Sequence, residues 1–132
     1  MQAGNLKTEE HTPMASISYD VSENAMVYFM YSEGYRDGGF PARFTGVVPI
    51  PLPNYEPEFV ENYEVGVKST LLDGRLRVNA SAFLMDYTDM QISATSALPG
   101  VGDNTTKFNL GDAQYKGFEL ELTALVTDNL LV

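Results

Sequence analysis

Apolar and polar residues alternate along most of the chain, most clearly from Phe59 to Ile92. The apolar positions are Tyr63, Val65, Val67 and Leu71, followed in the opposite phase by Leu76, Val78, Ala80, Ala82 and Leu84. A period of two is typical of a β-strand with one apolar face. Between the two parts, Asp73-Gly74 predicts a turn, because Gly tolerates positive φ and Asp tolerates the left-handed region. The pattern therefore predicts a hairpin of two long strands.

The length of these two strands bears on the class of protein. An ordinary strand has ~5–6 residues, whereas each arm of this hairpin keeps its alternation for roughly 10 residues, the length with which a tilted strand crosses a bilayer. A strand of a soluble β-sandwich can also be this long. Strand length alone leaves both a membrane barrel and a sandwich open.

The rest of the chain predicts further strands and two kinds of connection. Strands are expected at Ala15–Tyr19, Ala25–Tyr35 and Phe108–Val126, with the start of another at Leu130–Val132. Short polar turns are expected at Asp20–Asn24 and Thr127–Asn129, and long loops rich in Pro or Gly at Arg36–Glu58 and Ser93–Lys107. Turns and loops alternate, so a meander would gather the turns at one end of the sheet and the loops at the other. Outer-membrane barrels have this asymmetry.

Aromatic residues agree with a barrel. Several lie near the expected loop ends of their strands, where the aromatic girdle of a membrane barrel lies: Tyr31, Tyr35, Phe59, Tyr63, Tyr87 and Phe108. The fold expected from the pattern is all-β, an antiparallel up-and-down meander that forms part of a transmembrane β-barrel. The alternative is a soluble all-β ligand-binding module, such as a carbohydrate-binding sandwich.

Composition excludes several classes of function. The 132 residues carry a net charge of −10 from 8 basic and 18 acidic side chains, without the basic cluster that nucleic-acid binding needs. Cysteine is absent, which excludes disulfides and thiolate metal sites. Residues 1–12 form a polar lead-in without the features of a secretory signal peptide. If the protein acts outside the cytoplasm, we expect the chain to be a piece of a longer one.

Catalytic and metal-binding residues are sparse. His11 is the single histidine and lies in the polar lead-in, so no Ser/His/Asp set is expected. Asp86 and Asp89 are expected to be solvated rim residues, because nothing suggests that their pKa values are pushed apart. Asp103-Asn104 with Asp112 offers oxygen ligands for Ca²⁺, but without EF-hand spacing. We expect no enzyme activity, no catalytic residue, no metal site and no cofactor.

Three motifs resemble one family, the TonB-dependent outer-membrane receptors. Tyr28–Phe40 is similar to its Y-x-x-Y-S-x-G-Y-[RK]-x-G-G-F strand and loop, and Tyr55–Ser69 to its Y-x-P-E-x-x-x-x-Y-E-x-G-x-K motif. Tyr115–Glu121 continues the likeness in the same order. The resemblance implies that residues 13–132 are five to six strands of a barrel of ~22 strands. It covers barrel only, so the chain is expected to be an internal fragment.

The resemblance also implies a function. Such receptors take up a scarce nutrient across the outer membrane of Gram-negative bacteria: a ferric siderophore, cobalamin, haem or a glycan. The implied partners are outer-membrane lipid, a small-molecule substrate such as a metal chelate, and the TonB energy-transducing complex. That complex would act through a plug domain and a box that have no counterpart in this chain. No nucleic-acid partner is implied.

Two sets of site residues follow. The polar phase of the strands is expected to face the barrel lumen: Glu64, Lys68, Arg75, Arg77, Glu119 and Glu121. Loops on a rigid scaffold carry recognition, and Arg pairs with carboxylate or phosphate in bidentate fashion. The candidates for substrate contact are therefore Tyr35, Arg36, Arg43 and Phe44.

Overall fold

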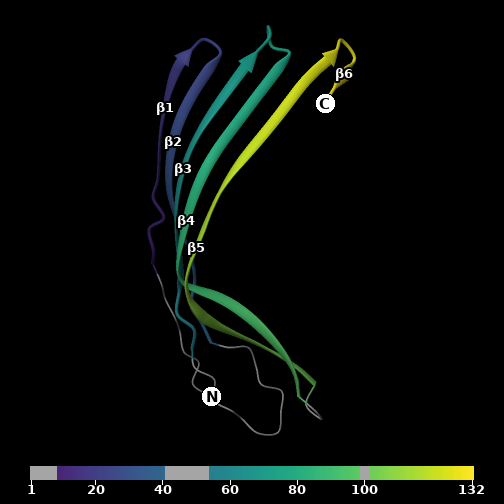
Figure 1. The fold of residues 1–132 in the computed structure, drawn as a ribbon. Helices are drawn as coiled ribbons and strands as arrows, with labels where there is room; N and C mark the ends of the chain where they lie inside the picture. Colours follow the sequence, from purple (N-terminus) through teal and green to yellow (C-terminus); the bar gives the residue numbers. More distant parts are fainter. Residues whose placement is uncertain (1–8, 41–53, 99–101) are drawn as a thin grey trace. The chain divides into compact units, whose positions relative to one another are not determined.

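The chain forms one six-stranded antiparallel sheet, in which every strand lies beside its neighbour in sequence (Figure 1). The computed structural model describes residues 9–40, 54–98 and 102–132, with side chains for all of these except 96–98 and 102–104. The strands are β1 (Met14–Ser22), β2 (Ala25–Arg36), β3 (Glu58–Leu71), β4 (Leu76–Leu98), β5 (Gly102–Thr127) and β6 (Leu130–Leu131). The predicted all-β, up-and-down meander is confirmed, including the central hairpin of β3 and β4.

Register in the first hairpin follows the alternation of the sequence. Ile17 pairs with Phe29 and Tyr19 with Val27, so apolar residues of β1 and β2 share one face. Ser18 pairs with Tyr28 on the other face. The turn between the strands is shorter than predicted, since β1 continues to Ser22 and only residues 23 and 24 form the turn.

The predicted long loop at Ser93–Lys107 is wrong. β4 continues to Leu98 and β5 begins at Gly102, so most of this segment is strand, and residues 99–101 lie outside the described residues. The Pro and Gly residues that suggested a loop lie at or beside residues 99–101, and the strands extend on either side of them. The hydroxyl oxygens of Thr95 and Thr105 lie 2.8 Å apart, a cross-strand pair that stabilises a sheet.

The chain divides into two compact units, each of which takes pieces of several strands. The turn unit consists of Pro13–Glu33, Glu61–Asp86 and Gln114–Val132. The loop unit consists of Met1–Thr12, Gly34–Val60 and Tyr87–Ala113. All three predicted short turns belong to the turn unit, and the long connection between β2 and β3 belongs to the loop unit.

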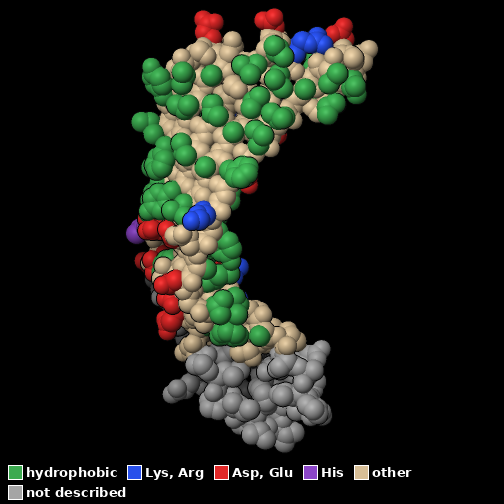
Figure 2. Space-filling model, viewed as in Figure 1, with side chains coloured by type: hydrophobic (Ala, Val, Ile, Leu, Met, Phe, Trp, Pro, Cys, Tyr) green, Lys and Arg blue, Asp and Glu red, His purple; other side chains and the backbone are tan. Residues whose placement is uncertain are grey.

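The turn unit has an apolar face that no other part of the described chain covers. No apolar side chain among the described residues is buried, and Ile17 and Phe118 are 70% and 84% exposed. Figure 2 shows hydrophobic side chains spread over the sheet, with charged ones at the end that carries the turns and a further charged group nearer the other end. A soluble sandwich would bury such residues in a core. The soluble alternative is therefore not favoured.

Helices play no part in the described structure. Within those residues, no helix is long and apolar enough to cross a membrane.

Candidate functional site

The polar face of the turn unit centres on Tyr28 of β2. Its hydroxyl donates to Glu64 Oε1 at 2.6 Å, and Lys68 Nζ lies 5.3 Å from the ring centroid. Glu64 and Lys68 both project from β3, four residues apart and therefore on the same face. One aromatic ring thus holds an acid and a cation together, through a charge-assisted hydrogen bond and a cation–π contact.

Gly66 lies directly under this ring. A Cβ atom at Gly66 would be 2.5 Å from three atoms of Tyr28, far inside contact distance. The absence of a side chain is therefore what allows the tyrosine to lie flat between Glu64 and Lys68. The ring can move aside only by giving up both of these contacts.

Substitution of Gly66 tests this packing. In the complete barrel, we expect Gly66→Val to destabilise the fold by about 1–3 kcal/mol, the usual cost of overpacking. The measurement is the urea midpoint, with the folded fraction scored by heat-modifiable mobility on gels. Adding Tyr28→Ser to the variant should restore part of the loss, because it removes the clashing ring. A double variant no more stable than Gly66→Val alone would contradict the account.

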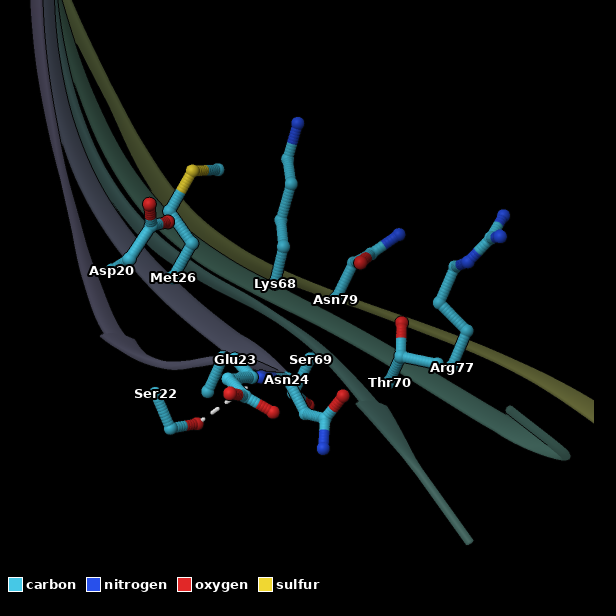
Figure 3. Close-up of a pocket in the computed structure, with 11 residues that line it drawn as sticks. Asp20, Ser22, Glu23, Asn24, Met26, Lys68, Ser69, Thr70, Arg77 and Asn79 are labelled. Atoms are coloured by element: carbon cyan, nitrogen blue, oxygen red, sulfur yellow. Dashed lines mark hydrogen bonds between the residues drawn. The ribbon is translucent and has the colours of Figure 1, made fainter. Parts of the chain in front are cut away.

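The same face continues across β4 and β5. Asn79 Nδ2 donates to Glu121 Oε2 at 2.9 Å. Beside this pair, an open basin of about 910 Å³ is lined by residues that include Asp20, Lys68 and Arg77. Figure 3 shows the side chains of Lys68, Asn79 and Arg77 extending to the same side of the sheet. The basin therefore carries charges of both signs.

Most residues predicted to face a lumen thus lie on one polar face. Glu119 is two residues before Glu121 on β5 and has the same phase. Arg75 lies in the turn before β4, with Nη1 3.3 Å from Asp128 Oδ1, and its place in a lumen stays a prediction. Both side chains are well exposed, so the pair contributes about 0–1 kcal/mol.

Two tyrosines lie at the margin of the apolar face of the turn unit. The rings of Tyr31 and Tyr63 lie 5.0 Å apart, and the Tyr31 hydroxyl donates to the Glu33 carboxylate. The Tyr63 hydroxyl donates to Glu61 Oε2 at 3.3 Å. Each tyrosine therefore has an apolar body and a polar tip satisfied by a carboxylate, as residues at a membrane–water boundary do.

The loop unit contains an amide site that the sequence analysis missed. Gln91 is 6% exposed, the single buried polar or charged residue among those described. Its Nε2 donates to the backbone oxygens of Asp37 at 2.9 Å and Glu56 at 3.0 Å. Asn109 also binds Glu56, since its Nδ2 donates to the Glu56 oxygen at 3.0 Å and its Oδ1 accepts from the Glu56 N–H at 2.7 Å. A lone polar residue in a strand gives no sequence signal for such contacts.

The predicted substrate contacts are only partly described. Tyr35 is half-buried and stacks on Phe59, with ring centroids 6.3 Å apart. Its hydroxyl donates to Asp37 Oδ1 at 3.0 Å, and this bond raises the pKa of Tyr35, so the group stays protonated. Arg36 is exposed at the end of β2. Arg43 and Phe44 lie outside the described residues, so all four stay predictions.

The residues considered for metal binding are only partly described. Within the described part of the chain, no group of three or more His, Asp or Glu side chains is placed to hold a metal ion. Asp112 Oδ1 accepts from the backbone N–H of Asp89 at 3.3 Å, and the side chains of Asp103 and Asn104 are outside the described set.

Comparison with known proteins identifies relatives over most of the chain. Residues 2–130 match the family described as TonB dependent receptor-like, beta-barrel. The Ferric-pyoverdine 358 receptor of Pseudomonas putida is 29% identical over 87% of this chain and 13% of the receptor. The Metal-pseudopaline receptor CntO of Pseudomonas aeruginosa is 33% identical over 90% of this chain and 15% of the receptor. The chain thus spans only about an eighth to a seventh of the length of these relatives.

Solved structures show the same fold. The ferric yersiniabactin uptake receptor FyuA from Yersinia pestis superposes with a TM-score of 0.63 at 24% identity, over 87% of this chain and 16% of that one. The ferric-catecholate import receptor Fiu from E. coli superposes with a TM-score of 0.59 at 21% identity, over 87% of this chain and 16% of that one. At these identities the likeness concerns the fold alone.

Proposed function

Because the chain belongs to the family of TonB-dependent receptor β-barrels, we propose that it forms part of the wall of an outer-membrane receptor that takes up ferric siderophores. The observation that carries this proposal is the sheet itself, which exposes an apolar face without any buried apolar core among the described residues. Such a sheet is stable where lipid covers the apolar face and neighbouring strands pair with its edges.

The two faces of the turn unit then have different surroundings. The apolar face, with Phe118, Leu120 and Leu122, contacts acyl chains, and Tyr31 and Tyr63 mark the boundary of the membrane. The polar face is directed into the lumen, where water solvates its charges: Glu64, Lys68, Arg77, Glu119 and Glu121. We propose residues 13–132 as the barrel segment.

The substrate class follows from the names of the relatives. They include receptors for ferric pyoverdine and for metal–pseudopaline, both of which are metal chelates. We assign this chain the same class of cargo, admitted without any bond being made or broken. Tyr35, Arg36, Arg43 and Phe44 are the proposed contacts, and the TonB complex is the proposed source of energy.

Transport by the complete receptor in its own bacterium tests the proposal. Deletion of the gene should abolish uptake of ⁵⁵Fe supplied as one member of a siderophore panel that includes ferric pyoverdine, and the plasmid-borne gene should restore it. A strain without TonB is the control, because uptake should be lost there as well. Unchanged uptake of every siderophore in the deletion strain would reject siderophore transport. Uptake that persists without TonB would reject the energy source.

A further inference from the structure

Gln91 is buried, whereas the other described side chains are at least partly exposed. A buried amide is costly unless it is hydrogen-bonded, and a bonded one orders the groups around it. We propose that Gln91 and Asn109 form an amide clamp that positions the two stems of the β2–β3 connection, Asp37–Phe40 and Asn54–Pro57. This inference rests on the proposed function where it concerns recognition, because the stems adjoin the candidate contacts Tyr35 and Arg36.

Gln91 ties the two stems together through one nitrogen atom. An amide NH₂ group has two hydrogens, and Gln91 Nε2 donates to Asp37 on the first stem and to Glu56 on the second. The backbone N–H of Gln91 also donates to the Glu58 carboxylate at the start of β3. Gln91 Oε1 accepts no hydrogen bond from the described residues. Gln91 therefore connects the two stems through its NH₂ group alone.

Asn109 binds the backbone of the second stem with its side chain, in the way that a neighbouring strand would bind it with its backbone. It pairs with both the N–H and the C=O of Glu56, which is the pattern of a β-ladder supplied by a side chain. Its Nδ2 also donates to the Asp89 oxygen of β4 at 2.6 Å. The second stem is thereby attached to β5, and through the same amide to β4.

The stems also bind each other directly. Gly39 and Tyr55 form an isolated antiparallel bridge, in which the backbone N of each residue lies 2.9 Å or 3.0 Å from the backbone oxygen of the other. A Cβ atom at Gly38 would lie 2.7 Å from the backbone oxygen of Tyr55, so the close approach of the two stems requires glycine there. Lys107 Nζ lies 5.3 Å from the centroid of the Tyr55 ring. The two stems are therefore joined to each other at the base of the connection.

A closed base has a predictable effect on ligand binding. Ordering a recognition loop costs conformational entropy at the moment of binding, and a loop fixed beforehand costs less. The clamp bonds reach loop backbone and not apolar packing, so their loss should release the stems without unfolding the barrel. Substrate affinity should fall, whereas the maximal rate of uptake should not.

Isosteric variants of the complete receptor test the clamp. Gln91→Met keeps the volume of the side chain and removes its donors, and Asn109→Leu does the same on β5. The matched control is Gln114→Met, which removes a strand glutamine whose Nε2 donates to Asp86 Oδ1 at 2.7 Å in the turn unit. Amide hydrogen exchange by mass spectrometry is measured on peptides that cover Asp37–Phe40, Asn54–Pro57 and, as a reference, Ala25–Phe29.

We expect exchange of both stems to accelerate about tenfold in Gln91→Met, as the loss of one to two hydrogen bonds implies, with the reference peptide unchanged. The half-saturation concentration for ferric pyoverdine should rise by a similar factor at unchanged maximal uptake. Unchanged stem exchange in the folded Gln91→Met receptor, or equal acceleration in Gln114→Met, would overturn the clamp. A smaller yield of folded barrel, with wild-type stem exchange in the molecules that do fold, would overturn it as well. If the wild type transports no siderophore, the proposed function fails, and the exchange result still decides the clamp.

Discussion

Leu120→Arg is expected to destabilise the complete barrel by about 2–4 kcal/mol, the cost of a charge on the lipid face near the bilayer midplane. Leu120 is 61% exposed on the apolar face, between the exposed Phe118 and Leu122 of β5. Glu121→Arg keeps a charge on the opposite face and loses the hydrogen bond from Asn79, so we expect it to destabilise the barrel by about 1 kcal/mol. The measurement is urea unfolding of receptor refolded into phospholipid vesicles.

Leu120→Ser separates a lipid-facing site from a protein core. Removing a large side chain from a packed core costs about 2–5 kcal/mol, partly because a cavity remains. Acyl chains fill the space at a lipid-facing site, so the loss for Leu120→Ser should be clearly smaller than for Leu120→Arg. Comparable severe losses for both variants, with Glu121→Arg tolerated, would indicate that protein covers Leu120.

Aggregation is the expected result when the 132-residue chain is expressed alone without detergent. The large exposed apolar side chains include Ile17, Phe29, Val65, Phe118 and Leu120. An exposed apolar face of this kind promotes association with other chains, and so do the unpaired backbone groups of β1 and of the part of β5 that the short β6 does not pair with. Size-exclusion chromatography and circular dichroism, with and without a non-ionic detergent, measure the effect.

Detergent provides the internal control for this experiment. Micelles should increase the soluble fraction by covering the apolar face, whereas a folded soluble module would gain nothing from them. A monodisperse monomer that melts cooperatively in plain buffer would contradict the barrel assignment and support the soluble binding module.

The strands could be predicted from the sequence because a period of two is a local property. Tyr63, Val65 and Val67 alternate with polar or small residues without reference to any distant part of the chain, and β3 forms there. The hairpin end near Thr95 and Thr105 could not be predicted in the same way. The Pro and Gly residues of Ser93–Lys107 favour a loop locally, and only the pairing across the hairpin decides that most of the segment is strand.

In the candidate site, too, the sequence could predict what depends on local pattern and not what depends on distant contacts. Glu64 and Lys68 fall on one face by phase alone, so the sequence could group them. The clamp could not be found, because Gln91 reaches backbone atoms 54 and 35 residues away along the chain. The turn that contains Arg75 ends one residue later than the alternation suggests. Contacts made across a fold override phase at such positions.

The space under Tyr28 has a consequence for how this segment tolerates change. In most soluble proteins the demand for close steric fit is concentrated in the apolar interior. In the turn unit we expect this demand on the polar face, where Gly66 admits the Tyr28 ring, whereas none of the described apolar side chains is buried. We therefore expect exchanges among Val, Ile, Leu and Phe on the apolar face to change the stability of the barrel little. The polar face should hold the positions at which a single added methyl group is not tolerated.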